Sequence, residues 1–80
     1  MTKEQYDSLS VEKKAEICAN LLDNGFSDYG DSCKLEEDGR YYFESADGEL
    51  FLNYAPEELV KRFEQFYADS DRFEEEIKHL

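Results

Sequence analysis

The chain has little of what most catalytic sites are built from. Among its 80 residues are one histidine, His79, and two cysteines, Cys18 and Cys33. A histidine beside the last residue is most simply a solvated side chain, because chain ends fray and a helix C-terminus favours a cation. Two cysteines without a nearby histidine or second cysteine pair do not form a zinc site. We therefore expect no metal centre and no nucleophile activated by histidine.

Glycine is also scarce, and its residues are dispersed. The four glycines each fall in a separate predicted turn or loop: Gly25, Gly30, Gly39 and Gly48. A phosphate-binding loop needs clustered glycines. An EF-hand calcium loop needs oxygen ligands at alternate positions and glycine at the sixth. Frames starting at Asp23 or Asp28 place Asp28 or Cys33 at that sixth position, so only weak cation binding stays open. We expect no cofactor and no enzymatic activity.

Basic residues and long apolar runs are also in short supply. The nine Lys and Arg residues are scattered, which argues against direct binding to nucleic acid. No apolar run approaches membrane-spanning length, and the first residues lack the pattern of a secretory signal. Both cysteines fall at predicted core positions, where they behave as small apolar groups. We expect a reduced, cytoplasmic setting and no membrane contact.

Acidic and apolar residues are what the chain does have. Hydrophobic residues make up 40% of it, including six Phe and six Tyr, which is enough for one compact core and predicts a single domain over 1–80. Twenty-one Asp and Glu give a net charge of −12. Such an excess costs folding energy through self-repulsion. It serves either solubility or high-salt tolerance, or it serves binding to a basic partner.

Helical periodicity marks both ends of the chain. A short helical turn over 2–9 precedes Ser10, a candidate N-cap. The helix behind it has its apolar stripe at Val11, Ala15, Cys18, Leu21 and Leu22, and it is expected to end at Asn24-Gly25. Pro56 suits the first position of another helix. Its expected stripe is Leu59, Val60, Phe63, Phe66 and Tyr67, and a last helix follows with Phe73, Ile77 and Leu80.

Between these helices, alternating residues predict three strands over 33–37, 40–45 and 49–54, with Asp38-Gly39 as a two-residue hairpin turn. The expected fold is α+β, a three-stranded antiparallel meander flanked by helices on one face, in the order α-β-β-β-α-α. Strand parity directs one set toward the core: Cys33, Leu35, Tyr41, Phe43, Leu50, Leu52 and Tyr54. It directs the other set away: Lys34, Glu36, Tyr42, Glu44, Glu49, Phe51 and Asn53.

A first acidic cluster falls on loops, turns and the outer face of the predicted sheet. Its candidate partner-binding residues are Asp28, Asp31, Glu36, Glu37, Asp38, Glu44, Asp47 and Glu49. Tyr42 and Phe51 are predicted on the same outer face. Aromatic anchors inside a charged rim are typical of binding hot spots. The alternative is that a helix covers this face and both rings belong to the core.

A second acidic cluster belongs to the last helix and the residues before it: Asp69, Asp71, Glu74, Glu75 and Glu76. It is either a further binding surface or simply a solvated helix face. The two clusters would form one surface if the last helix packed beside the sheet edge. A fixed pattern of carboxylates can copy phosphate spacing and occupy a site that binds DNA or RNA.

In architecture and charge, the chain resembles the small acidic inhibitors made by phages and mobile elements, especially anti-CRISPR proteins that mimic DNA. The features that carry this resemblance are the turn Glu36-Glu37-Asp38-Gly39, the strand Tyr41-Tyr42-Phe43-Glu44-Ser45 and the acidic last helix. One such type has a similar element order and an acidic face that blocks the PAM-reading site of a Cas nuclease. The resemblance implies a PAM- or DNA-binding groove as target, whereas the residues alone imply only a basic partner.

Two other functions stay open from the sequence. One is an immunity protein that neutralises a basic nuclease toxin, and the other is a small acidic adaptor module. The expected partner is a basic nucleic-acid-binding protein, a CRISPR effector or nuclease, and the chain is a monomer or a homodimer. A dimer could use an exposed edge strand or the patch of Tyr42 and Phe51.

Overall fold

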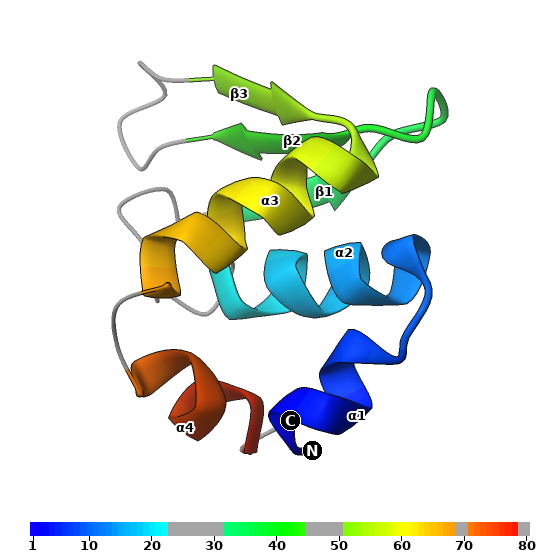
Figure 1. Cartoon of the computed structure of the whole chain (residues 1–80). Coiled ribbons are helices and arrows are strands. Elements are labelled where there is room, and N and C mark those ends of the chain that lie inside the picture. The colour runs from blue at the N-terminus through cyan, green and yellow to red at the C-terminus, as the bar shows by residue number, and fades with distance from the viewer. Residues whose placement is uncertain (23–31, 45–50, 69–70, 79–80) are drawn as a thin grey trace.

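The computed structural model describes residues 1–22, 32–44, 51–68 and 71–78. The described elements, in chain order, are α1 (Lys3–Asp7), α2 (Val11–Leu21), β1 (Ser32–Leu35), β2 (Tyr41–Glu44), β3 (Phe51–Tyr54), α3 (Pro56–Tyr67) and α4 (Arg72–Lys78). The three strands form an antiparallel sheet in the order β1-β2-β3. Helices α2 and α3 lie together on one face of this sheet, and α1 and α4 lie beyond them (Figure 1). The predicted α+β class and meander are confirmed.

Local hydrogen bonds explain where the helices begin. Ser10 caps α2 as predicted, because its side chain accepts a bond of 3.3 Å from the backbone N–H of Lys13. Thr2 and Gln5 cap α1 reciprocally. Pro56 opens α3, where a missing N–H costs nothing. Helix α2 ends at Leu21, and the predicted stop at 24–25 lies outside the described residues.

The hairpin between β1 and β2 corrects one prediction. The closing contacts are bonds of 3.0 Å from the N–H of Glu36 to the carbonyl of Arg40 and from the N–H of Gly39 to the carbonyl of Glu36. The loop is therefore three residues, 37–39, rather than the expected two-residue turn. Gly39 has φ of 81°, a conformation that glycine adopts at little cost. The resulting register pairs Leu35 with Tyr41.

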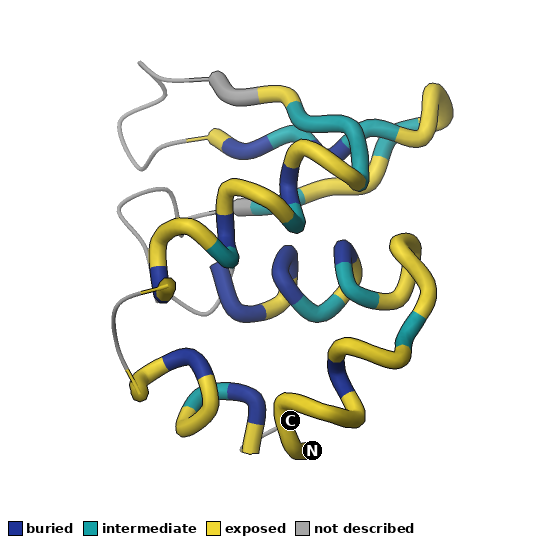
Figure 2. The backbone as a smooth tube through the Cα atoms, viewed as in Figure 1, coloured by how far each residue is buried: buried dark blue, intermediate teal, exposed yellow. Residues whose placement is uncertain are grey.

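The core lies between the sheet and the helices and continues down to α4 (Figure 2). Its largest side chains with almost no exposure include Tyr6, Phe43, Phe63 and Leu59. The ring of Tyr6 packs edge-on against Phe73 with 5.1 Å between centroids. Aromatic rings on α1, α3 and α4 thus join the outer helices to the rest of the molecule, and burial of such rings stabilises a small domain efficiently.

Three residues of the predicted apolar faces are exposed. The exposed fractions are 61% for Phe66, 57% for Leu35 and 38% for Val11. Leu35 points to the core side of the sheet, but it is the last residue of an edge strand, where cover from the helices is incomplete. Phe66 lies in the last turn of α3 at the margin of its stripe, and Val11 is the first residue of α2. The strand register supports the predicted face of Leu35, but the burial expected of all three side chains is wrong.

Candidate functional site: two acidic surfaces

The β1–β2 turn carries a compact acidic surface, the hairpin patch, formed by Glu36, Glu37, Asp38 and Tyr42. The carboxylate of Asp38 accepts bonds from the backbone N–H of Arg40 at 3.0 Å and from the Tyr42 hydroxyl at 2.9 Å. These donors hold the pKa of Asp38 below its usual value. The hydrogen bond from the Tyr42 hydroxyl to Asp38 also raises the pKa of Tyr42. The turn thus presents a carboxylate that stays ionised.

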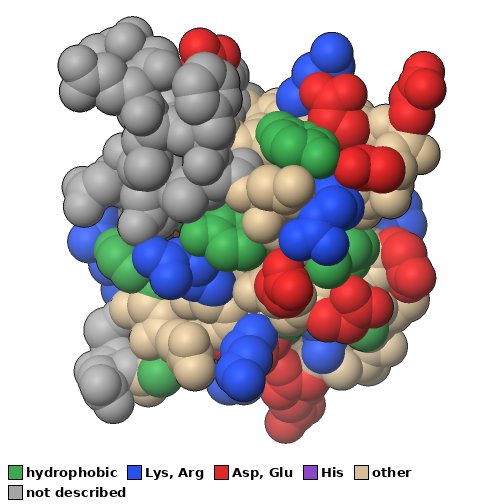
Figure 3. All heavy atoms as spheres, turned by 90° about the horizontal axis from the view of Figure 1, so that it is seen from above, with side chains coloured by type: hydrophobic (Ala, Val, Ile, Leu, Met, Phe, Trp, Pro, Cys, Tyr) green, Lys and Arg blue, Asp and Glu red, His purple; other side chains and the backbone are tan. Residues whose placement is uncertain are grey.

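Tyr42 belongs to the outer face of the sheet. Its neighbours Tyr41 and Phe43 are buried on the opposite face, while Tyr42 is half-buried and pairs with Lys34 on one side and Asn53 on the other. Helices α2 and α3 lie on the core side (Figure 1), so they do not cover Tyr42. Over the described part of the outer face, acidic side chains stand beside basic ones (Figure 3).

Arg40 holds the hairpin patch in place. Its guanidinium lies 3.1 Å from the Glu58 carboxylate of α3, and it donates hydrogen bonds to the side chain and the backbone carbonyl of Asn53. The same Glu58 oxygen accepts a bond of 3.1 Å from the N–H of Ala55 at the start of α3. Strand β3, helix α3 and the hairpin turn are therefore tied through one carboxylate and one guanidinium.

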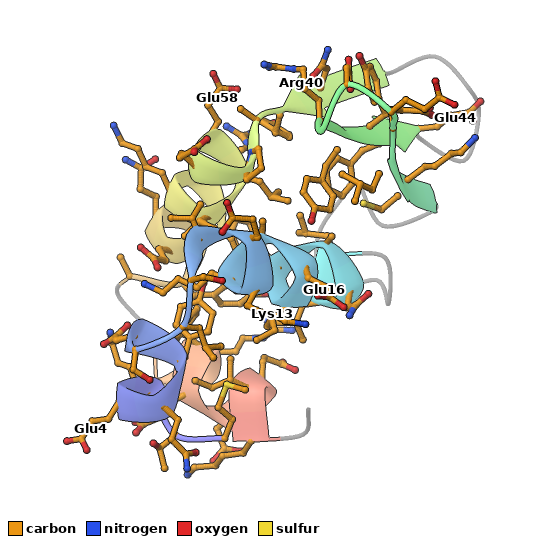
Figure 4. The ribbon with its side chains drawn as sticks, turned by 90° about the vertical axis from the view of Figure 1, so that its right-hand side faces the viewer. Glu4, Lys13, Glu16, Arg40, Glu44 and Glu58 are labelled. Carbon is orange, nitrogen blue, oxygen red and sulfur yellow. The ribbon has the colours of Figure 1, made fainter. Side chains whose placement is uncertain are left out.

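Other members of the first cluster are less fully described. Glu44, at the far end of β2 from the turn, is exposed (Figure 4). Phe51 is described through its backbone only, which pairs with Glu44. Four further candidates lie outside the described residues: Asp28, Asp31, Asp47 and Glu49.

The second cluster lies elsewhere on the molecule. Asp71, Glu74 and Glu75 are exposed, and Glu76 is half-buried beside Arg72, at 3.4 Å from the guanidinium. Asp69 lies outside the described residues. Helix α4 contacts α1 and α3, and the layer of α2 and α3 separates it from the sheet (Figure 1). Among the described residues, the members of the two clusters do not form one surface, because α4 does not pack beside the sheet edge.

A groove beside this second cluster contains residues that the sequence did not single out. It lies between α1, the end of α3 and α4, and has a volume of about 430 Å³. We call it the α1–α4 groove; it is lined by Lys3, Asp7, Glu64, Tyr67, Ala68, Asp71, Phe73 and Glu74. Asp71 and Glu74 were candidates of the second cluster, whereas Lys3, Asp7 and Glu64 were not singled out. The signal for Lys3 and Asp7 was their i,i+4 spacing, which places them on one helix face.

The charges of the described residues are unevenly paired. Six of the nine basic residues form ion pairs, and Lys14 and Arg62 lie over the rings of Tyr6 and Tyr54. By contrast, nine acidic side chains within the described ranges form no ion pair: Glu4, Glu12, Glu37, Asp38, Glu44, Glu57, Glu64, Asp71 and Glu74. They occur at both ends of the molecule, with Glu4 and Glu44 far apart (Figure 4).

No group of three or more His, Cys, Asp or Glu side chains suited to holding a metal ion occurs among the described residues. Within the same part of the chain, no helix combines the length and apolar character needed to cross a membrane. Comparison with known proteins finds no family model, no curated protein and no solved structure that significantly matches the chain.

Proposed function

We propose that this protein is an inhibitor that binds the basic nucleic-acid-binding surface of a CRISPR effector or related DNA-processing enzyme by mimicking the charge of DNA. The observation that carries this proposal is the unequal pairing of charge. Nine described carboxylates have no ion-pair partner, whereas eight of the nine basic residues are held by intramolecular ion pairs or aromatic rings. The surface thus offers negative charge, and its own cations do not neutralise it.

Scale also supports mimicry. The longest dimension of the fold is 35 Å, and duplex DNA carries about 20 phosphate charges over that length. The net charge of −12 is within a factor of two of this value. Such a charge accelerates encounter with a basic groove and disfavours acidic partners. Binding of this kind needs only geometry and sign, and it would take place in the bacterial cytoplasm, where CRISPR effectors act.

The hairpin patch is the surface we assign to this contact. Its turn has a fixed backbone, an ionised Asp38, and the half-buried ring of Tyr42 beside the carboxylates. Arg40 anchors it to α3. A rigid acidic turn with an aromatic neighbour loses little conformational entropy on binding, which favours affinity.

The test is capture of proteins from a bacterial lysate on the immobilised chain, at low and moderate salt, with and without competing duplex DNA. We expect capture of a basic nucleic-acid-binding protein, and its release by DNA. Capture that DNA does not disturb would favour the immunity or adaptor function instead. Failure to capture any such protein at either salt would mean that the charge serves solubility.

Variants in which two glutamates are neutralised test which end of the molecule makes the contact. Glu36→Gln with Glu37→Gln removes two charges from the turn but keeps Asp38, whose two hydrogen bonds shape the loop. Glu12→Gln with Glu57→Gln is the matched control, because both residues are exposed, form no ion pair in the described structure and lie outside both clusters. We expect the first variant alone to weaken capture. Equal weakening by both would show that total charge, rather than the hairpin patch, determines binding.

A further inference from the structure

We propose that the α1–α4 groove binds an arginine side chain of a partner protein. The identification of this partner with the target named above rests on the proposed function. The affinity of the groove for a guanidinium group is independent of that function. The volume of the groove, about 430 Å³, falls within the range of about 300 to 1,000 Å³ that is typical of ligand sites.

The walls of the groove combine an apolar floor with a carboxylate rim. Tyr67 and Phe73 lie in the floor, where they are 2% and 7% exposed and pack against each other and against Phe63. This packing fixes the floor. The four acidic residues of the lining come from three helices and the turn that precedes α4: Asp7, Glu64, Asp71 and Glu74. The aliphatic stem of a basic side chain suits such a floor, and its charged end suits the rim.

The chain itself places one cation in this groove. The ammonium group of Lys3 lies 3.1 Å from the Asp7 carboxylate and 5.9 Å from the centroid of the Phe73 ring. It thereby makes the two contacts, with a carboxylate and with an aromatic ring, that a basic ligand would make. The Lys3 and Asp7 side chains are 59% and 51% exposed, and an ion pair this exposed is worth about 0 to 1 kcal/mol. Lys3 can therefore move aside at little cost.

Lys3 leaves most of the negative charge in the groove uncompensated. Glu64, Asp71 and Glu74 form no ion pair within the described residues. Three carboxylates around one groove repel one another, and a cation placed among them relieves that repulsion. The groove is therefore complementary to a positive group from outside the chain.

Guanidinium fits this arrangement better than ammonium does. Its five donors lie in a plane and can bond to several carboxylates at once, whereas an ammonium group acts as a point charge. Guanidinium is also more weakly hydrated, so contact with the apolar floor costs it less. Arginine is enriched in protein interfaces for these reasons. We therefore expect arginine to bind the groove more tightly than lysine.

The test is a titration of the ¹⁵N-labelled chain with N-acetyl-arginine amide, followed by amide chemical shifts. N-acetyl-citrulline amide, an uncharged analogue of similar shape, is the control ligand. We expect saturable shifts at residues of the groove such as Asp7, Phe73 and Glu74 with the arginine probe but not with the citrulline control. The lysine analogue should bind there more weakly. Equal shifts with citrulline, or shifts spread evenly over all acidic segments, would overturn the proposal.

Variants then test the rim. Glu64→Gln with Glu74→Gln should weaken binding of the arginine probe by about two- to fivefold for each charge removed. Glu12→Gln with Glu57→Gln, which changes the net charge equally but lies outside the groove, should leave it unchanged. Lys3→Ala should strengthen it by about two- to fivefold, because the internal competitor is removed. Equal losses in both double variants, or weaker binding after Lys3→Ala, would contradict a groove-specific site.

These outcomes are independent of the lysate experiment. A chain that captures and releases a DNA-binding protein but shows no groove shifts would retain the proposed function and lose this site. A chain that binds the arginine probe but captures no such protein would keep the site and lose the proposed target.

Discussion

The guanidinium group of Arg40, in the hairpin, lies 3.1 Å from the carboxylate of Glu58, in the first turn of α3. Glu58 also accepts the N–H of Ala55, so the ion pair joins the acidic turn to a helix end that is already fixed. The side chains of Arg40 and Glu58 are 36% and 59% exposed. In this setting the ion pair itself contributes little to stability, and its larger effect is to orient the turn.

Replacement of Arg40 separates the geometry of the turn from its charge. Arg40→Ala makes the chain more acidic but removes the contacts to Glu58 and Asn53. We expect the free energy of unfolding in urea to fall by about 1 to 2 kcal/mol, and capture of the proposed target to weaken. Lys61→Ala is the control, because it changes the charge equally at an exposed residue with no ion pair in the described structure. Similar capture by both variants would show that the orientation of the turn does not matter.

Gly39 sets the shape of the same turn. Its φ of 81° strains any side chain, although an added Cβ would meet no atom within 4 Å. We expect Gly39→Ala to lower the free energy of unfolding by about 1 to 2 kcal/mol through the backbone alone. Gly39→Asn should cost less, because asparagine tolerates this conformation. Urea unfolding monitored by circular dichroism measures both, and equal stability of the two variants would argue against the left-handed turn.

Two phenylalanines of α3, three positions apart, should differ sharply in their contribution to stability. Phe63 is 2% exposed and contacts Tyr67 and Phe73, whereas Phe66 is 61% exposed. We expect Phe63→Ala to cost about 3 to 5 kcal/mol and Phe66→Ala about 0.5 kcal/mol or less. Thermal unfolding monitored by circular dichroism compares them. If Phe63→Ala fails to fold, Phe63→Leu should show an intermediate loss, and equal stability of all variants would place Phe63 outside the core.

The buried pair of Tyr6 and Cys18 should make the protein sensitive to alkali. The Tyr6 hydroxyl lies 3.3 Å from the Cys18 sulfur. Burial raises the pKa of Cys18 from 9.0 to about 12. It also raises the pKa of Tyr6 above 10.0, and the bond to Cys18 adds to this shift. Both groups stay protonated in the folded state at pH values where the unfolded chain ionises.

The stability that Cys18 contributes is therefore complete below pH 9.0 and is lost as the pH rises toward about 12. Cys18 and Tyr6 each add up to about 1.4 kcal/mol per pH unit to the fall in the free energy of unfolding. We expect urea unfolding between about pH 8 and pH 11 to show this decline. The double variant Tyr6→Phe with Cys18→Ala should have a shallower slope. Burial also raises the pKa values of Tyr41 and Tyr67, so some slope should remain. An unchanged slope would mean that the pair does not ionise on unfolding.

Most of the secondary structure follows from local chemistry in the sequence. Ser10 and Pro56 mark helix starts because capping and a fixed φ act within a few residues. The faces of β2 follow from alternation alone, with Tyr41 and Phe43 buried. The acidic candidates of the hairpin patch were also evident in the sequence, because turn signals and charge are local properties.

The hairpin register required more than a turn motif. A two-residue turn at Asp38-Gly39 would have paired Leu35 with Tyr42. Paired residues share one face of the sheet, but alternation assigns Leu35 to the core face and Tyr42 to the outer face. Tyr41 and Phe43 are buried, and Cys33, opposite Phe43, packs against the same core; only an odd loop places these residues on one face. Core packing therefore overrode the local turn preference, and Gly39 made the longer loop possible.

By itself, the sequence determined the element types, the capped helix starts, the strand faces and the excess of negative charge, because each depends on neighbouring residues or on composition. Only the tertiary structure decided where these features lie in space. It placed the hairpin patch and helix α4 at opposite ends, and it brought Asp7, Glu64 and Glu74 around one groove. Those positions depend on how α2 and α3 pack against the sheet and how Tyr6, Phe63 and Phe73 join the outer helices to them. Contacts between residues far apart in the chain set these positions, and no local pattern encodes them.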